Sequence, residues 1–269
     1  MNITYIYLFH FIIYSFLGWI CETTYCSIID KQYVNRGFLK GPFCPIYGAG
    51  ALIVVIILSP FSDNIIMLYL TAMIFTSILE YITGFLLETM FHLKWWDYSN
   101  YKFNIKGRVC LLNSTLFGIL SVITIEIINP ILVDITKSFS INVVIWTCNI
   151  LIIYFAVDAM ITTARVMQLG GKLKEMSTLF EEIREKSESY KGLLQQNLSR
   201  IDEIIGQDNE ALAHTKEQIN KLKLKLESVI LKDKSVNKRI IKAFPNIKSL
   251  NHQYSLDKLK EEIKKLRRK

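Results

Sequence analysis

Four acidic side chains lie within or beside long apolar stretches of the sequence. They are Glu22, Glu80, Glu88 and Asp158. An ionisable group inside a bilayer is costly and usually faces the interior of a helical bundle. Two roles suit such carboxylates: a pathway for protons or cations, and structural ion pairing. Glu22 would pair with Arg36. Glu88 would pair in the same way with Arg108, and for both glutamates the two alternatives stay open.

Glu80 is the better candidate for a pathway, because it lies ten residues from the inner end of its apolar stretch at Met90. Glu80, Gly84 and Glu88 are spaced by four, so they share one broad side of a helix. A glycine on that side lets a neighbouring helix approach closely.

No catalytic or metal-binding pattern accompanies these carboxylates. The sequence lacks HExxH, GxSxG and a Ser-His-Asp arrangement, and its five cysteines and four histidines form no zinc spacing. We therefore expect no catalytic residues, no metal site and no cofactor. The sequence also lacks a P-loop of the form GxxxxGKS or GxxxxGKT, so the chain cannot itself power transport with ATP.

The carboxylates must be positioned by membrane helices. The chain has 269 residues, 51% of them hydrophobic, and a mean hydropathy of +0.28. That is too apolar for an ordinary soluble protein. About 20 apolar residues are needed to cross a bilayer. Five such stretches are predicted, at residues 3–23, 43–59, 65–90, 109–128 and 141–164. The second of these stretches is near the short limit, and the fourth ends at the turn signal Asn129-Pro130.

Basic residues are unevenly distributed between the loops. With five spans, loops 24–42 and 91–108 lie on the same side as the C-terminal part, and they hold seven Lys and Arg residues. The opposite side holds only Lys137. Because Lys and Arg in short loops favour the cytoplasm, we expect a multi-pass protein with its N-terminus outside and its C-terminus cytoplasmic.

The first and third spans end alike. Gly18-Trp-Ile-Cys-Glu22-Thr23 matches Gly84-Phe-Leu-Leu-Glu88-Thr89, and each is followed by a basic loop and a span with a cysteine near its start. A span-loop-span unit returns the chain to its starting side, so two copies are parallel. We therefore predict an all-α membrane domain at residues 1–165, with parallel helical-hairpin repeats at about 3–60 and 65–128 and an extra span at 141–164.

The two basic loops are candidate mouths of a pathway. The first contains NRGFLKGPFCPIYG, Asn35 to Gly48, whose prolines suit the first turn of the helix that follows. Irregular backbone near membrane depth must be buried in protein or line a cavity. One interpretation is a tight turn anchored at lipid headgroups, and the other is an anion-accepting mouth. The candidate residues are Asn35, Arg36 and Lys40 in the first loop and Trp95, Trp96, Asp97, Asn104 and Arg108 in the second.

The second loop contains WWDYS, Trp95 to Ser99. Trp and Tyr suit the headgroup layer, so an aromatic belt is one alternative and a contact with a substrate or partner is the other. Asp97 and Ser99 are suited to capping a short turn.

Residues 166–269 form a helical tail that carries the whole net charge of +8. Gly170-Gly171 predicts a break after the fifth span, and Pro245 a stop to the tail helix. A cytoplasmic coiled coil is predicted from positions that alternate by three and four, namely 198, 201, 205, 208, 212, 215, 219, 222, 226 and 229. The basic end attracts anionic lipid headgroups or is a solvated stalk. The scarcity of aromatic residues among its cations disfavours nucleic acid.

Five runs carry a resemblance to a known family: GWICETTY, NRGFLKGPFCPIYG, LEYITGFLLETMF, WWDYS and FNIKGRVCLLNS. They resemble bacterial membrane proteins labelled ABC-transporter permeases of the CmpB type. The resemblance covers about residues 10–120 and leaves the tail outside. It implies an integral protein of the bacterial cell membrane.

Two functions compete at this point. The first is a permease-type transport component for an unknown solute, served by an ATPase subunit in trans. The second is a membrane-anchored scaffold or sensor that assembles partners, including a second copy of itself, through its coiled coil. The charged residues in the spans favour the first and the long tail favours the second. A membrane enzyme is a third option that no constellation supports.

Overall fold

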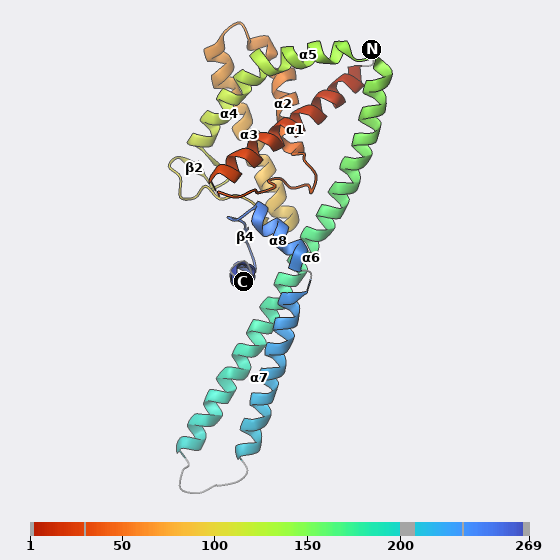
Figure 1. Ribbon diagram of the computed structural model, residues 1–269. Helices are drawn as coiled ribbons and strands as arrows, with labels where there is room; N and C mark the ends of the chain where they lie inside the picture. The colour runs from red at the N-terminus through yellow and green to blue at the C-terminus, as the bar shows by residue number, and fades with distance from the viewer. Residues whose placement is uncertain (1–2, 30, 200–207, 233, 266–269) are drawn as a thin grey trace. The chain divides into compact units, whose positions relative to one another are not determined.

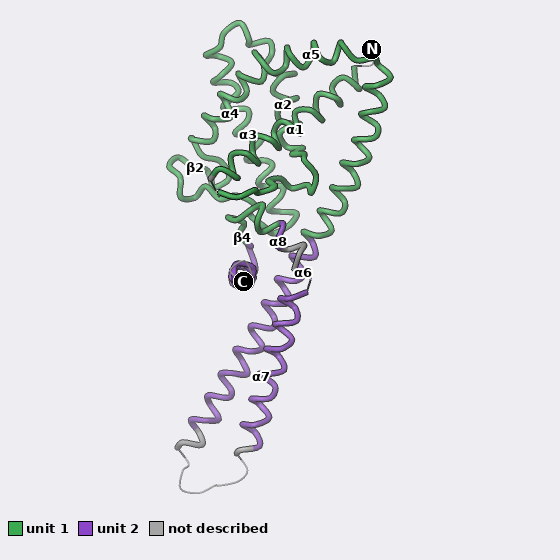
Figure 2. Tube along the Cα trace, viewed as in Figure 1, with its two compact units in different colours: residues 1–166, 240–248 green, residues 167–239, 249–269 purple. Residues whose placement is uncertain are grey.

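Residues 3–29, 31–199, 208–232 and 234–265 are described by the computed structural model, which is mostly helical (Figure 1). The chain forms two compact units (Figure 2). The first contains residues 1–166 and 240–248, and the second contains residues 167–239 and 249–269.

The helices of the first unit alternate in direction. Figure 1 shows that α1, α3 and the first part of α6 run one way, while α2 and α4 run the other way. Their bounds are α1 (Ile3–Ile29), α2 (Pro45–Leu58), α3 (Ile65–Phe91), α4 (Leu111–Ile123), α5 (Asn129–Ser138) and α6 (Ile141–Ser199).

Four helical segments among the described residues are long and apolar enough to cross a membrane. They are Ile3–Ile28, Ile65–Phe91, Leu111–Ser138 and Ile141–Gln195. The predicted multi-pass, α-helical membrane protein is therefore supported. The second predicted span is α2, which continues into the short η1 (Ser59–Phe61). Its 14 residues rise about 21 Å, less than the hydrocarbon core of about 30 Å. The count of five spans therefore stays a prediction.

The expected turn at Asn129-Pro130 is wrong, because the chain stays helical there. A π-helical turn, η2 (Thr124–Ile128), joins α4 to α5, and Asn129 N donates to Thr124 O. Pro130 lies in the first turn of α5, where its missing N–H costs little. The π turn shifts the hydrogen-bond ladder by one residue, so the helix changes course without ending.

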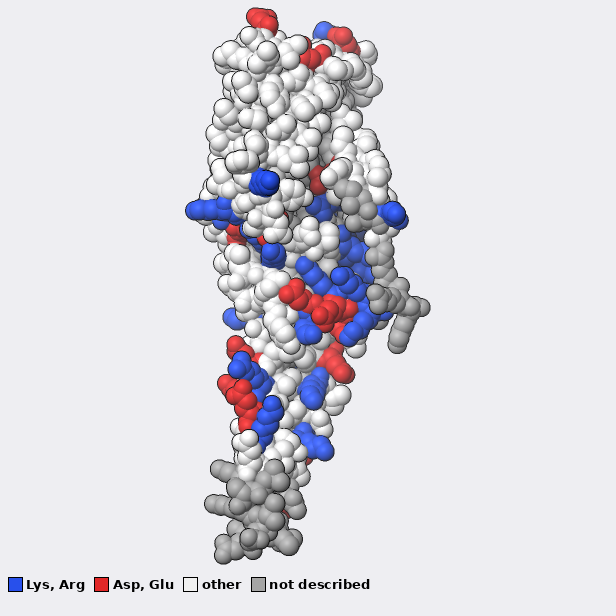
Figure 3. Space-filling model, turned by 90° about the vertical axis from the view of Figure 1, so that its left-hand side faces the viewer, with Lys and Arg blue, Asp and Glu red and all other residues white. Residues whose placement is uncertain are grey.

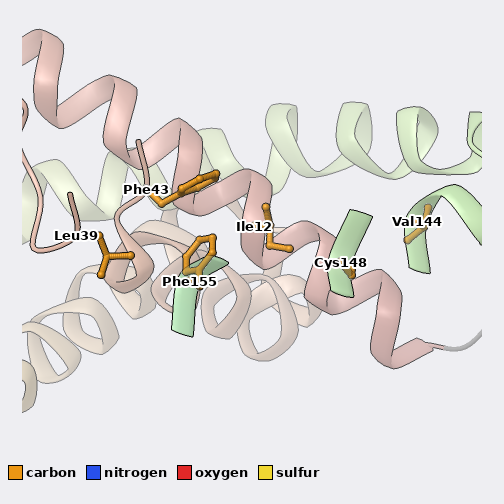
Figure 4. Packing of buried hydrophobic residues seen from close by; sticks show 6 residues of the cluster. All are labelled: Ile12, Leu39, Phe43, Val144, Cys148 and Phe155. Atoms are coloured by element: carbon orange, nitrogen blue, oxygen red, sulfur yellow. The ribbon is translucent and has the colours of Figure 1, made fainter. Parts of the chain in front are cut away.

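Two apolar clusters hold the first unit together. One joins α1 and the first loop to α6 (Figure 4), through Ile12, Leu39, Phe43, Val144, Cys148 and Phe155. The other joins α2, α3 and η2, through Val54, Leu58, Leu68, Ala72 and Ile125. Many large apolar side chains on the outer faces stay exposed, as a lipid-facing surface requires. Figure 3 shows this surface as a white band above the Lys and Arg side chains of the loop end.

Short strands fix the loops, a detail that the all-α prediction did not include. They are β1 (Leu93–Lys94), β2 (Asn104–Ile105), β3 (Val109–Cys110) and β4 (Lys248–Ser249). β2 pairs antiparallel with β3, and β1 pairs with β4.

The second unit is built on the rest of α6, α7 (Asp208–Leu231), the start of α8 (Lys234–Ala243) and α9 (Gln253–Lys265). The predicted break at Gly170-Gly171 is wrong, because α6 continues to Ser199. Each glycine costs about 1 kcal/mol relative to alanine. The adjacent side chains of Leu169 and Leu173 are at most 1% exposed, and their burial offsets that cost.

Helix α7 lies beside α6 within the second unit (Figure 1), and Lys172 Nζ of α6 donates to Ile230 O at 3.0 Å. Positions 212, 215, 219, 222, 226 and 229 of the predicted seam are among the less exposed positions of α7. Positions 198, 201, 205 and 208 lie outside the described side chains. The structure thus shows a helical hairpin within one chain, and the coiled coil stays a prediction.

Candidate functional site

Glu22 lies near the end of α1 and pairs with Arg36 of the first loop. Arg36 Nε donates to Glu22 Oε1 at 3.1 Å, and the hydroxyl of Tyr47 in α2 donates to Glu22 Oε2. Arg36 N also donates to Thr23 Oγ1 at 3.3 Å. The predicted pairing of Glu22 with Arg36 is therefore confirmed, and Tyr47 adds a second donor.

Glu88 near the end of α3 pairs with Arg108 of the second loop in the same manner. Arg108 Nε and Nη2 donate to Glu88 Oε2 at 2.9 and 2.5 Å, which confirms the predicted pair. Arg108 Nη1 donates to the hydroxyl of Tyr81 at 3.1 Å, and the guanidinium lies 5.1 Å from the centroid of that ring. The pair is well shielded, because the Glu88 and Arg108 side chains are 10% and 15% exposed.

The two hairpins place equivalent residues at equivalent points. Glu22 and Glu88 are 66 residues apart, and so are Cys44 and Cys110. Each cysteine is the N-cap residue of the second helix of its hairpin, with an extended backbone. In each hairpin a carboxylate from the first helix thus meets an arginine from the loop, and the structural repeat itself stays a prediction.

Asp158 of α6 binds the backbone of the first loop. Its Oδ1 accepts from Lys40 N at 3.1 Å and its Oδ2 accepts from Gly41 N at 2.7 Å. Thr162 Oγ1 also donates to Oδ1 at 3.3 Å. Buried N–H groups outside secondary structure need such partners. Asp158 therefore serves the irregular backbone of the loop, while the Lys40 side chain is exposed.

Asn35 fixes the same loop against α1. Its Oδ1 accepts from Trp19 Nε1 at 2.8 Å and its Nδ2 donates to Lys40 O at 2.9 Å. Cys44 N donates to Ser15 O at 2.9 Å, which lies about two turns before Glu22. The loop thus folds back along the last turns of α1, and its backbone is buried in protein as expected.

The second loop folds back along α3 through Trp96 and Asn104. Trp96 Nε1 donates to Arg108 O at 2.8 Å. Asn104 Nδ2 donates to Tyr101 O at 2.8 Å, and Asn104 Oδ1 accepts from Gly107 N at 3.0 Å. Gly107 has φ +67°, a conformation that glycine adopts readily. The Asn104 side chain therefore stabilises the loop through hydrogen bonds to its backbone.

Asp97 organises the WWDYS turn, as predicted. Its Oδ1 accepts from Ser99 N at 3.2 Å and Ser99 Oγ at 2.5 Å. Lys94 lies 2.8 Å from Oδ1 and Lys248 lies 2.5 Å from Oδ2. Burial alone would raise the pKa of Asp97, but hydrogen bonds from Lys248, Lys94 and Ser99 hold that pKa well below its usual range.

Trp95 departs from the aromatic-belt interpretation, because it is only 4% exposed. Its ring packs edge-on against Phe38 and Phe91, at centroid distances of 5.4 and 6.0 Å. Phe244 approaches the same ring at 4.8 Å. Trp95 is therefore the centre of an aromatic cluster between the loops.

Among the residues that the structure describes, Glu80 has no arginine partner of the kind that Glu22 and Glu88 have. It is 9% exposed, Tyr98 of the WWDYS loop hydrogen-bonds to it, and its charge interacts with that of Glu22. Glu80 Oε2 has no hydrogen-bond partner within the described part of the chain. Glu22, Tyr47, Glu80 and Tyr98 thus form one group, which we call the acidic cluster.

The structure therefore divides the predicted residues. Glu22, Arg36 and Glu80 meet at the acidic cluster, and Glu88 and Arg108 form a separate pair. Asp158, Asn35, Trp96 and Asn104 bind loop backbone. Asp97 pairs with lysines, Trp95 packs among aromatic rings, and the Lys40 side chain is exposed. Sequence reasoning missed Tyr47 and Tyr98. Gly18 was a signal for Tyr47, because a Cβ at Gly18 would lie 2.3 Å from Tyr47 Cβ. Among the described residues, no group of three or more His, Cys, Asp or Glu could hold a metal ion.

Comparison with known proteins agrees with the resemblance and extends it. No curated protein and no solved structure matches the chain. The family described as "Putative ABC-transporter type IV" matches residues 9–163, from α1 to the part of α6 that holds Asp158. Because the match covers more than half of the 269 residues, this chain belongs to that ABC-transporter family of the CmpB type.

Proposed function

We propose that this chain is a permease-type transport component of the cell membrane whose acidic cluster binds and passes protons. The observation that carries the proposal is Glu80, a buried carboxylate with one oxygen unpartnered among the described residues. Buried ionisable groups in membrane helices mark substrate, ion and proton pathways. The membership in an ABC-transporter family supports transport as the activity.

The chemistry of the cluster favours a proton over a metal cation. Glu22 receives hydrogen bonds from Arg36 and Tyr47, so both of its carboxylate oxygens have partners. Within the described part of the chain, Glu80 has no arginine or lysine partner, and one of its oxygens has no hydrogen-bond donor. Glu80 is therefore the carboxylate of the cluster that is able to bind and release a proton.

The distribution of Lys and Arg supports an orientation with the N-terminus outside. Both loops and residues 166–269 would then face the cytoplasm, and the basic tail would lie near anionic headgroups. In a background without the native cysteines, Asn64→Cys should react with an impermeant thiol reagent on intact cells. Asn100→Cys should not react, and its labelling from outside would reject this orientation.

An ATPase subunit is the partner that the proposal requires if transport is driven by ATP, because the sequence has no P-loop. We expect such a subunit to copurify with the chain after crosslinking in native membranes. Recovery without any ATPase would leave the proton gradient as the energy source.

Proton flux through purified, reconstituted protein tests the proposal. A potassium diffusion potential is imposed on proteoliposomes that contain a pH-sensitive dye. The wild-type protein should admit protons faster than protein-free liposomes, and Glu80→Gln should reduce the rate to that background. Glu126→Gln is the matched control, since Glu126 is an exposed carboxylate of η2. Equal flux in wild type and Glu80→Gln would reject the proton site.

The scaffold or sensor remains a second candidate because of the hairpin of α6 and α7 in the second unit. Apolar side chains such as Leu224 and Leu231 remain more than half exposed on α7, which offers a surface to a partner. A full-length protein that captures a partner through α7, and loses it in Leu224→Glu, would favour this candidate.

A further inference from the structure

Residues 240–248 lie far along the tail yet belong to the first unit. Their apolar side chains are deeply buried: Ile240, Ala243 and Ile247 are at most 1% exposed. The family match ends at residue 163, so this docking is a feature of the chain's own tail. We call residues 240–248 the strap.

The strap contacts both loops through Phe244. The ring of Phe244 meets the ring of Trp95 edge-on, with centroids 4.8 Å apart and an interplanar angle of 82°. The guanidinium carbon of Arg36 lies over the same ring, 4.9 Å from its centroid. One aromatic side chain thus joins the first loop to the second, through a cation–π contact and an aromatic pair.

Two polar contacts hold the strap, one near its middle and one at its last residue. Arg36 Nη1 donates to Ala243 O. Lys248 Nζ lies 2.5 Å from Asp97 Oδ2, and the Asp97 side chain is only 8% exposed. A carboxylate with so little exposure binds a cation more strongly than a fully solvated one. The strap is therefore attached by buried apolar side chains along its length, by a hydrogen bond at Ala243 and by an ion pair at its last residue, Lys248.

Arg36 connects the strap to the acidic cluster. The same guanidinium that binds Ala243 O and Phe244 also binds Glu22. Cys44 lies beneath it, 4% exposed, and its Sγ donates to Arg36 O at 3.7 Å. The strap and Glu22 therefore share one cation, and Cys44 contacts the backbone of that same residue.

We propose that the strap, residues 240–248, is a latch that closes the loop end of the acidic cluster and opens by releasing Phe244 and Lys248. The contacts described above are those that hold the latch closed. Its effect on transport rests on the proposed function.

The rate at which Cys44 reacts with a thiol reagent measures whether the latch is closed or open. In full-length protein the other cysteines are replaced, as Cys21→Ser, Cys26→Ser, Cys110→Ala and Cys148→Ala, and modification of Cys44 by N-ethylmaleimide is timed. Phe244→Ala should raise the rate about tenfold, because it removes one aromatic contact and one cation–π contact. Tyr254→Ala is the matched control, since Tyr254 packs on Phe180 in the second unit.

Lys248→Glu is the second variant. The Lys248 side chain is 54% exposed in the wild-type protein, so the substitution leaves the core intact. It should also speed the modification, by a smaller factor. Unchanged rates in both variants would overturn the latch, and so would an equal increase in Tyr254→Ala. If Phe244→Ala fails to fold, the rate of Cys44 modification in Lys248→Glu alone tests the latch. The labelling rate judges the latch and the proton flux judges the acidic cluster, so the two failures are distinguishable.

Discussion

Arg108 gives two hydrogen bonds to a single oxygen of Glu88, at 2.9 Å from Nε and 2.5 Å from Nη2. Its guanidinium also donates to the hydroxyl of Tyr81, two helical turns before Glu88 on the same face of α3. The loop that separates Glu88 from Arg108 is therefore closed at its two ends by one ion pair. Removal of either charge leaves the other in a poorly solvated place.

Glu88→Gln should lower the stability of the protein in detergent. An unpaired charge in a shielded site typically costs about 3–5 kcal/mol, so the melting temperature should fall clearly. The double variant Glu88→Gln with Arg108→Gln should recover part of the loss, because no charge is then stranded. Thermal unfolding of the four proteins in one detergent gives the coupling energy.

The matched comparison is Glu22→Gln in the first hairpin, where the glutamate is 24% exposed rather than 10%. Its destabilisation should be smaller, because water solvates the remaining arginine better. A Glu88→Gln protein that melts like the wild type, with no coupling to Arg108, would remove the structural role of this pair.

Gly18 and Gly84 occupy equivalent positions but should respond differently to alanine. A Cβ at Gly18 would lie 2.3 Å from Tyr47 Cβ, an atom close to the backbone of α2. At Gly84 the nearest atom is Trp96 Cζ2 at 3.2 Å. Gly18→Ala should therefore cost about 1–3 kcal/mol, while Gly84→Ala should be nearly neutral, since alanine favours helix by about 1 kcal/mol. Melting temperatures of the two variants check this, and the reverse order would contradict the packing of α1 on α2.

Much of this arrangement was predictable because it is local in sequence. Glu22 and Arg36 are separated by one short loop, and so are Glu88 and Arg108, which limits how far apart the charges can be. The apolar stretches predicted α1, α3 and the start of α6 within a few residues. Pro45 lies in the first turn of α2 as its fixed φ suggests.

The rest depends on contacts between distant residues that no local pattern encodes. Asp158 binds the backbone N–H of Lys40 and Gly41 across more than a hundred residues of chain. Every residue except proline has a backbone N–H group, so the sequence does not indicate which of these groups a distant side chain binds. Gly170-Gly171 and Asn129-Pro130 were typical breaking signals, yet burial of Leu169 and a π turn before Pro130 overrode them. Phe244 gave no signal, because its partner Trp95 suited a headgroup layer equally well.

The ion pair of Asp97 with Lys248 predicts a pH dependence. The pKa of Asp97 is lower in the folded protein than its ordinary value of 3.8. A group of this kind stabilises the folded state above its unfolded pKa, and this contribution is lost as the pH falls toward the folded-state pKa. The melting temperature of the wild type should therefore drop as the pH is lowered below 3.8. The melting temperature of Asp97→Asn should be lower than that of the wild type at neutral pH and should fall less as the pH is lowered. Parallel curves of melting temperature against pH for the two proteins would contradict this role of Asp97.

The hairpin of the second unit predicts a crosslink within one chain. Lys172 Nζ reaches Ile230 O at 3.0 Å and Lys232 O at 2.6 Å. In a cysteine-free background, Lys172→Cys with Lys232→Cys should be joined by a short bismaleimide. The product should keep the mass of a monomer in denaturing electrophoresis. The pair Lys174→Cys with Lys232→Cys is a control on an exposed face of α6. Products of dimer mass alone would mean that the seam of α7 joins two copies instead.

The most direct test of the account compares two carboxylates of one helix. Glu80 and Glu88 of α3 are 9% and 8% exposed, but of the two the structure pairs only Glu88 with an arginine. Proton flux and melting temperature are measured on the same preparations of wild type, Glu80→Gln and Glu88→Gln. Glu80→Gln should abolish the flux and keep the melting temperature, whereas Glu88→Gln should lower the melting temperature and keep the flux of the folded fraction. Undiminished flux in Glu80→Gln, or its loss in folded Glu88→Gln alone, would contradict the assignment of Glu80 as the proton-binding group.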